Sequence, residues 1–179
     1  DYLSGYIQLG DMGLLKNLVV GNYRLRFGQG LILNSDFSLG KNMLLQGLIR
    51  QAASIKPHRG TGEGGHYTGA AATVAWRAWQ LTTFASYRRL DATLDGVSIS
   101  TLKTDGYRRT PLEQARKGNT RGNLFGAHLG YADHGFHLGM TVMYQSFNRN
   151  FALPTQSYKR YAPQGHDFWN ASVDYAWHH

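Results

Sequence analysis

The sequence contains no cysteine, and no stretch of about 18 consecutive apolar residues occurs in it. The first absence excludes disulfide bonds and thiolate metal sites, because both require cysteine sulfur. The second excludes a helix that spans a membrane. Acidic residues are also scarce, with 11 Asp and Glu against 19 Lys and Arg, so the formal net charge is +8. A positive balance of this size favours anionic partners.

Apolar and polar residues alternate with a period of two in several segments of the chain. In the segment 136–145, one face consists of Phe136, Leu138, Met140, Val142 and Tyr144, and the other of His137, Gly139, Thr141, Met143 and Gln145. The segments 79–88, 124–131 and 168–177 alternate in the same way. In the segment 19–28 the apolar face consists of Val19, Gly21, Tyr23, Leu25 and Phe27. The period predicts β-strands with one side suited to acyl chains and the other to water.

Aromatic residues recur eight positions apart on the apolar faces of three of these segments. The pairs are Trp79 and Tyr87, Phe136 and Tyr144, and Trp169 and Trp177. At about 3.3 Å per residue and a strand tilt near 40°, eight residues cover roughly 20 Å along a membrane normal. This height is close to the apolar band of an outer-membrane β-barrel, which aromatic girdles bound on both sides. The spacing therefore predicts a wall that faces lipid.

The connections predict the topology of this wall. Seven strands are expected, near residues 2–9, 17–28, 66–76, 79–90, 121–132, 136–147 and 168–177. Short turns at 11–16, 77–78 and 133–135 alternate with long loops at 29–65, 91–120 and 148–167. This rhythm is typical of an antiparallel, up-and-down transmembrane barrel with short periplasmic turns and long external loops.

The expected strand number also bears on the extent of the domain. Single-chain bacterial barrels have an even number of strands and at least eight. We therefore expect residues 1–179 to form one barrel domain that is an incomplete portion of a larger barrel, unless a further strand lies within residues 29–50. The first ten residues show no signal-peptide pattern, which indicates a processed or excerpted chain.

One short helix is predicted in the second long loop. Thr110 and Glu113 have the spacing of a capping box, Pro111 takes the first helical position, and Gly118 is a natural stop. We expect a helix over about residues 111–117. In an external loop it would serve as a lid or partner surface, or it would pack locally on the rim.

The basic residues suggest a functional hypothesis. Arg24, Arg26 and Arg88 fall on polar strand faces and are candidates for an anion-facing lumen. A basic cluster in the second long loop consists of Arg108, Arg109, Arg116 and Lys117. Such charges favour anions or polyanions such as DNA. The alternative is that external arginines bind phosphate groups of surface glycolipid and inward ones pair with acidic residues of other strands.

The sequence gives no convincing metal site, catalytic site or cofactor site. His134 and His137 flank a turn near Asp133, but three residues across a hairpin rarely converge on one ion. His128 and Asp174 are expected to point inward, yet nothing in the sequence fixes a nucleophile beside them. We therefore predict no enzyme, no metal and no cofactor.

Three segments together resemble a known protein family. They are residues 21–31 (GNYRLRFGQGL), residues 56–71 with their KPHRG and YTGAA motifs, and residues 106–113 (GYRRTPLE). Over about residues 17–131 the chain resembles the barrel region of helix-hairpin-helix, competence-type proteins of Gram-negative bacteria. The resemblance implies an outer-membrane location, a β-barrel and a link to DNA traffic. The helix-hairpin-helix part is absent from these 179 residues, so DNA binding is assigned to none of them.

The combined prediction is an outer-membrane barrel wall with a porin-like passage or a structural, anchoring role. Its expected partners are outer-membrane lipid and surface glycolipid. Two alternatives remain open. In the first, the barrel belongs to a DNA-uptake or DNA-handling component of the outer membrane. In the second, the chain is a soluble β-barrel that binds a ligand inside and buries the faces of Trp79, Leu138 and Trp169.

Overall fold

A computed structural model of the chain describes residues 4–27, 33, 54–60, 65–103, 109–152 and 164–177. Strands make up 77% of these residues and helix 4%, which confirms the prediction of an all-β fold. Within the described ranges no helix has both the length and the hydropathy needed to cross a bilayer. The elements in chain order are β1 (Tyr6–Met12), β2 (Leu15–Arg26), β3 (Ser54–Pro57), β4 (Tyr67–Trp76), β5 (Trp79–Asp95), β6 (Ser98–Lys103), α1 (Pro111–Ala115), β7 (Thr120–Asp133), β8 (Phe136–Phe151) and β9 (Gly165–Trp177).

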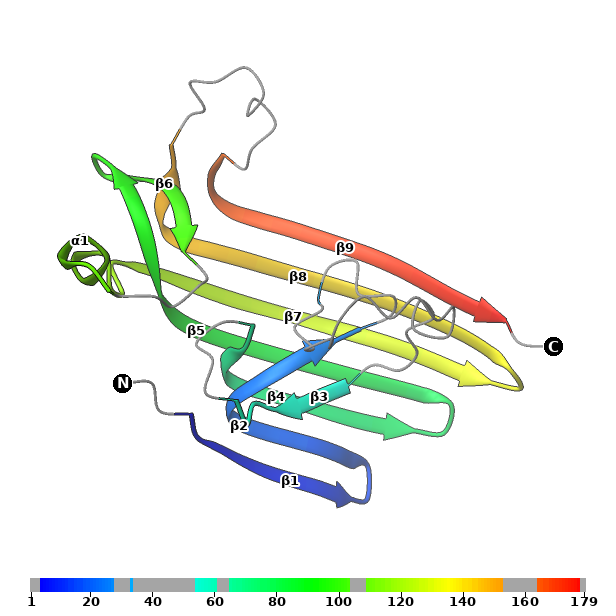
Figure 1. Ribbon diagram of the computed structural model, residues 1–179. Helices are drawn as coiled ribbons and strands as arrows, with labels where there is room; N and C mark the ends of the chain where they lie inside the picture. Colours follow the sequence, from blue (N-terminus) through cyan, green and yellow to red (C-terminus); the bar gives the residue numbers. More distant parts are fainter. Residues whose placement is uncertain are drawn as a thin grey trace, which may run out of the picture.

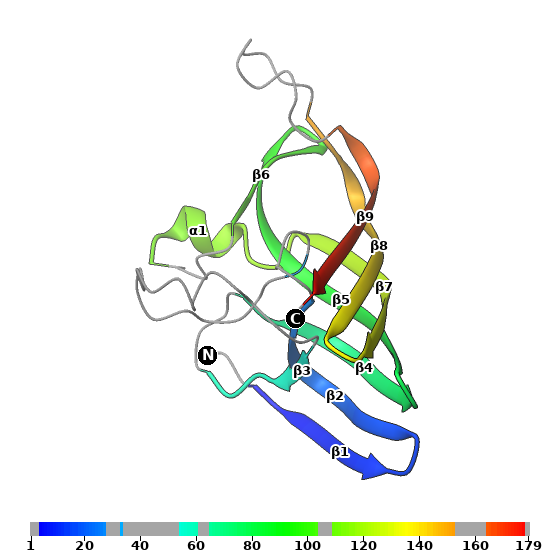
Figure 2. The same cartoon turned by 90° about the vertical axis from the view of Figure 1, so that its right-hand side faces the viewer.

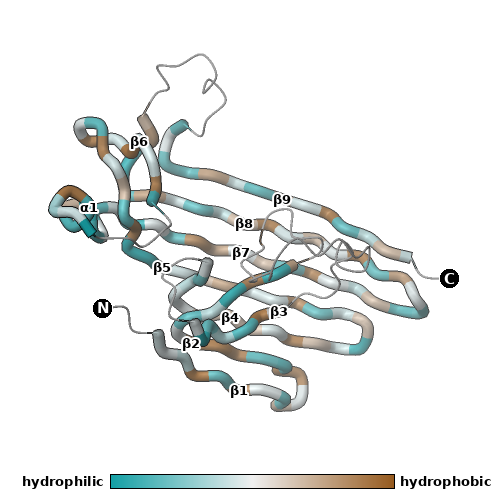
Figure 3. Tube along the Cα trace, in the orientation of Figure 1, coloured by the Kyte–Doolittle hydropathy of each residue, from teal (hydrophilic) through white to brown (hydrophobic). Residues whose placement is uncertain are grey.

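The long strands form one curved sheet in which neighbours in sequence are neighbours in space (Figures 1 and 2). The pairs β1–β2, β2–β4, β4–β5, β5–β7, β7–β8 and β8–β9 are all antiparallel. Hydropathy alternates along the strands, as Figure 3 shows, because successive side chains point to opposite faces. We call the face that carries Leu81 and Met140 the outer face, and the face that carries Thr82 and Thr141 the inner face.

The tight turns lie together at one end of the sheet, which we call the turn end (Figure 1). They connect β1 to β2, β4 to β5 and β7 to β8, and each contains two residues. Arg77 and His134 take positive φ values of 54° and 43° in these turns. The predicted turns at 77–78 and 133–135 are confirmed, and the predicted turn at 11–16 is tighter than expected. The opposite end, which carries β6 and α1, is the loop end.

A pair of glycines lets β2 leave the sheet. Gly21 and Gly69 are register partners on β2 and β4, with φ values of 112° and 154°. A Cβ on Gly21 would lie 2.3 Å from the carbonyl oxygen of Gly5, and one on Gly69 would lie 2.1 Å from that of Ala85. Only glycine tolerates these conformations and approaches. Beyond this point β2 folds over the inner face and pairs with β3.

The end of β2 and β3 therefore form a second layer, here called the inner layer, which consists of residues 22–27 and 54–57. Its apolar residues pack on inner-face residues of β4, β5, β7 and β8. The resulting core contains Val19, Tyr23, Leu25, Phe27, Leu33, Ile55, Ala71, Phe84, Leu124 and Met143. The Phe27 ring stacks on Phe84 with a centroid distance of 5.6 Å. The Tyr23 hydroxyl donates to the carbonyl oxygen of Ala85 at 2.7 Å.

This layer corrects one prediction. The sequence pattern placed Val19, Tyr23, Leu25 and Phe27 on the lipid side, but all four are buried on the inside. Their neighbour Val20 is the residue that is exposed on the outer face. A protein core and a lipid bilayer both select apolar side chains, so alternation alone does not distinguish them.

At the loop end, four strands close a small ring (Figure 1). β5 leaves β7 after Leu90 and pairs with β6, and β6 contacts β8 through Ile99 and Phe151. A second core fills this ring, with Ala92, Ile99 and Phe147 buried in it. The predicted loop 91–120 thus contains the end of one strand, all of another and the start of β7.

The short helix α1 forms where the sequence predicts it, although it ends earlier. The Thr110 side chain accepts from the amide of Glu113, and the Glu113 carboxylate accepts from the Thr110 amide, which completes the capping box. Gly118 follows at a φ of 58°, and its amide donates to Asp91. The helix therefore docks near the end of β5, on the rim of the sheet.

Candidate functional site: an apolar outer face and a basic inner layer

Outer-face residues form rows that run across the strands in register. The turn-end row consists of Trp76, Trp79, Tyr131, Leu138 and Tyr175. The middle row consists of Val74, Leu81, Leu129, Met140 and Val173. The loop-end row consists of Ile7, Val20, Ala70, Ala85, Phe125, Tyr144 and Trp169. Large aromatics thus concentrate in the two flanking rows. Two rows lie between them, the aliphatic middle row and a row of smaller side chains that consists of Ala72, Thr83, Ala127, Val142 and Ala171.

The six predicted girdle aromatics all lie on this outer face. The exposed ones are Trp79, Tyr87, Phe136, Trp169 and Trp177, and Tyr144 is half-buried. Neighbouring rings touch, with centroid distances of 4.8 Å between Trp79 and Tyr131 and 4.7 Å between Tyr144 and Trp169. The structure therefore brings these aromatics together in two bands. Their contact with lipid stays a prediction.

The middle row is open to its surroundings rather than covered by protein. Met140 is 48% exposed and Val173 is 62% exposed. The faces of Trp79, Leu138 and Trp169, which a soluble ligand-binding barrel would bury, are exposed as well. No described element packs on this face, and the inner layer lies on the opposite side of the sheet (Figure 2).

The inner face carries polar side chains that pair with one another. At the level next to the middle row it presents Thr73, Thr82, His128, Thr141 and Ser172, which are register partners across five strands. The hydroxyl oxygens of Thr73 and Thr82 lie 2.9 Å apart, and His128 Nδ1 lies 2.9 Å from the Thr141 hydroxyl. Buried polar groups need such partners. These two bonds pair the hydroxyls of the three threonines and one ring nitrogen of His128.

The inner layer turns basic side chains away from the sheet. Tyr23, Leu25 and Phe27 point at the sheet, so the alternation places Arg24 and Arg26 on the far side of the layer. On β3, Lys56 is exposed and is the register partner of Arg24. The register thus brings the side chains of Arg24 and Lys56 next to each other on this surface. Sequence reasoning missed Lys56, because β3 lies in a segment predicted to be a loop.

Two histidines fasten this layer near the loop end. The Arg24 guanidinium donates through Nε to Nδ1 of His58 at 3.0 Å. The His58 ring stacks on His66 with a centroid distance of 4.6 Å. The third predicted lumen cation, Arg88, lies on the inner face of β5 and donates to the carbonyl oxygen of His66. Arg24 and Arg88 thus flank the same buried pair of histidines.

The basic loop cluster is less compact than its sequence positions suggest. Arg109 precedes α1 and is exposed, Arg116 caps the helix and is half-buried, and Lys117 is exposed. Arg108 lies outside the described residues. The other three residues lie around one short helix at the rim, and they do not form a shared binding site within the described residues.

His128 is enclosed by the inner layer. It is 1% exposed, its ring stacks on Phe27 at 4.7 Å, and its Nε2 atom has no hydrogen-bond partner in the described part of the chain. Asp174 lies 3.4 Å from His137 on the same face. Among the described residues, the hydroxyl bonded to His128 is that of Thr141, which is itself buried. Across the described ranges, no three His, Asp or Glu side chains converge on a metal position.

Sequence reasoning also missed the hairpin of β5 and β6. A local signal for it exists, because Asp95-Gly96 is a favoured hairpin turn and Leu90, Ala92 and Leu94 alternate before it. Residues at the tip of this hairpin line a depression at the loop end.

Comparison of the chain with known protein families, with curated proteins and with solved structures gives no match.

Proposed function

We propose that the chain forms part of the wall of an outer-membrane β-barrel, with a basic inner layer that narrows the lumen and favours the passage of anions. The observation that carries this proposal is the outer face. Its aliphatic middle row is exposed, and rows rich in aromatics flank it at the turn end and, beyond one row of smaller side chains, at the loop end. Lipid-facing barrel walls have this arrangement.

The extent of the exposed apolar surface supports the same proposal. Large apolar side chains of β4, β5, β7, β8 and β9 meet in register across the outer face, so the exposed patch is continuous. Monomeric soluble proteins rarely expose contiguous apolar patches above a few hundred Å². A bilayer removes this cost, because the acyl chains replace water around the same side chains.

The two edges of the sheet support closure by further strands. Six successive antiparallel pairings separate β1 from β9, so both strands run from the loop end to the turn end. Direct pairing of β1 with β9 would therefore be parallel. An odd number of additional strands restores antiparallel pairing at both edges and gives the even total that is typical of bacterial barrels. A second copy of these seven strands in the same orientation would meet both edges in parallel.

The preference for anions comes from the far side of the inner layer. Arg24, Arg26 and Lys56 lie together there, and the layer stands between them and the barrel wall. Rings or patches of Arg and Lys in a pore lower the free energy of anions relative to that of cations.

The two ends of the sheet give the proposed orientation in the membrane. The short turns of the turn end would face the periplasm, and the loop end, with β6 and α1, would lie outside the cell.

Ion selectivity in planar bilayers tests the passage. We expect the full-length protein to conduct chloride in preference to potassium. Replacing Lys56→Gln should lower the permeability ratio, and adding Arg24→Gln should lower it further. The control is Lys16→Gln, an exposed lysine at the turn end, which should leave the ratio unchanged. A cation preference in the wild-type protein would overturn the proposal.

DNA passage is the second candidate, because the same three cations would also attract phosphates, which need no sequence recognition. This function would depend on the helix-hairpin-helix part that the resemblance implies. DNA retention by the full-length protein should then disappear when that part is deleted. Unchanged DNA uptake by a strain without the protein would eliminate this candidate.

A further inference from the structure

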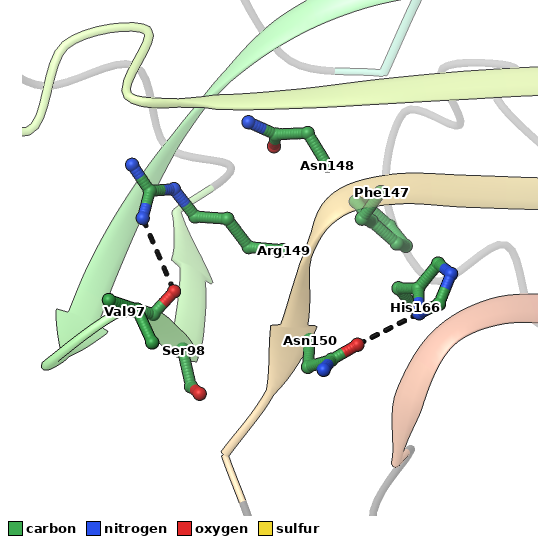
Figure 4. A pocket seen from close by; sticks show the side chains of 7 residues that line it. All are labelled: Val97, Ser98, Phe147, Asn148, Arg149, Asn150 and His166. Carbon is green, nitrogen blue, oxygen red and sulfur yellow. Dashed lines mark hydrogen bonds between the residues drawn. The ribbon is translucent and has the colours of Figure 1, made fainter.

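The loop end carries a groove made of two adjoining depressions, the first of which is shown in Figure 4. The first has a volume of about 490 Å³ and lies between the tip of the β5–β6 hairpin, the bent end of β8 and His166 of β9. The second, of about 570 Å³, extends it toward Asp95 and Phe151. Both depressions include Ser98 and Asn150, so they form one continuous groove. Volumes of this order are typical of small-molecule sites.

The floor of the groove belongs to an aromatic cluster, and a side chain bridges its walls. Phe147 and Phe151 line the groove and pack edge to face at 5.2 Å, and each also contacts the ring of Phe168, at 6.0 and 5.6 Å. Arg149 joins the two walls, because its guanidinium donates to the carbonyl oxygens of Val97 and Asn119 at 3.2 and 3.4 Å. A site that is already ordered loses little entropy when a ligand binds.

Several polar groups in the groove have unused hydrogen-bonding capacity. Asn148 accepts through Oδ1 from the amide of Arg121, and Asn150 Oδ1 bonds to His166 Nδ1, each at 2.8 Å. Both Nδ2 groups stay without a partner in the described ranges. The hydroxyl of Ser98, which lines both depressions, also has no hydrogen-bond partner in the described ranges. The groove therefore offers several neutral hydrogen-bonding groups beside an apolar floor.

We propose that this loop-end groove binds a neutral saccharide of about two pyranose rings. A pyranose has hydroxyl groups around its rim and C–H groups on its faces, which match the amides and hydroxyl of the walls and the side chains of Val97 and Phe151. An anion fits less well, because the guanidinium of Arg149 is already engaged with two backbone carbonyls. The source of the saccharide rests on the proposed function, which puts the groove outside the membrane. It is either the sugar part of surface glycolipid or a free oligosaccharide.

Saturation-transfer NMR on the full-length protein in detergent tests this inference without depending on conductance or insertion. The probes are maltose and the oligosaccharide released from lipopolysaccharide by mild acid. We expect saturation of the sugar ring protons with at least one probe. Asn150→Ala and Ser98→Ala should each weaken binding about 2- to 10-fold, the equivalent of one hydrogen bond. The matched control Asn170→Ala lies on β9 away from the groove and should bind as the wild type does.

The two probes also separate the sources of the sugar. Binding of maltose supports a free oligosaccharide, and binding of the released oligosaccharide alone supports glycolipid. The inference fails if neither probe receives saturation, or if Asn150→Ala and Ser98→Ala behave like Asn170→Ala. It also fails if intact lipopolysaccharide binds and neither sugar does, since binding is then to the lipid part. Loss of conductance in bilayers with intact sugar binding would overturn only the proposed passage.

Discussion

A charge placed on the middle row of the outer face should distinguish lipid from water as the solvent of that face. The change is Val173→Arg on β9. Val173 lies four residues from Trp169 and four from Trp177, and all three side chains point outward. At about 3.3 Å per residue and a tilt near 40°, the new charge would lie roughly 10 Å along the membrane normal from each aromatic. This depth is close to the middle of the apolar band.

The expected cost depends on the solvent. Arginine at the bilayer midplane of a barrel wall lowers the free energy of unfolding by about 2–4 kcal/mol. In water, a substitution of a side chain that is already exposed usually changes this free energy by less than about 0.5 kcal/mol. The two environments therefore differ by at least about 1.5 kcal/mol, which equilibrium unfolding resolves.

The neighbouring residue provides a matched control. Ser172 lies at nearly the same depth but on the inner face, so Ser172→Arg keeps the new charge out of lipid. The assay is urea unfolding of the full-length protein reconstituted in phosphatidylcholine vesicles, followed by tryptophan fluorescence. We expect a large loss for Val173→Arg and less than about 1 kcal/mol for Ser172→Arg, because lumen positions tolerate charge. Equal stability of Val173→Arg and wild type would refute lipid contact at the middle row.

The remaining predictions concern the inner layer and the helix. Gly69→Ala should lower the free energy of unfolding by about 1–3 kcal/mol, because its Cβ would collide with the carbonyl of Ala85, whereas Gly5→Ala should have little effect; equal urea midpoints would contradict this. Tyr23→Phe removes the hydrogen bond to the same carbonyl and should cost about 1 kcal/mol by the same assay, so an unchanged midpoint would argue against that bond. Thr110→Ala should destabilise α1 by about 1 kcal/mol, seen as faster hydrogen exchange at its third amide, and unchanged exchange would show that the cap is dispensable.

The outer wall could be predicted from the sequence because its rules are local. Alternation with a period of two fixed the strands that carry Trp79, Phe136 and Trp169, and the turn at 133–135 set the register of β7 and β8. The helix cap at Thr110 is also local, because its partner Glu113 lies three residues away in the sequence. These features depend only on residues near each other in the chain.

The inner layer could not be predicted in this way, because it depends on contacts between distant segments. β2 leaves the sheet where Gly21 meets Gly69, which lies 48 residues away in the sequence. Beyond the bend, Tyr23 and Leu25 pack against protein, yet in the sequence they read like a lipid-facing strand. β3 has only four residues and shows no periodicity of its own, so Lys56 was hidden in a predicted loop.

The distribution of burial across the wall is the reverse of that in a water-soluble sheet. Thr82, Thr141 and His128 are at most 2% exposed on the inner face, whereas Leu81, Leu129 and Met140, their neighbours along the same strands, are 42–48% exposed on the outer face. A sheet that folds in water gains stability by covering its aliphatic face and leaving its polar face hydrated. The inner layer instead covers the polar face, where hydrogen bonds between the Thr and His side chains replace part of the lost hydration. We propose that an apolar solvent around the outer face makes this arrangement favourable, and a charge at Val173 tests that proposal.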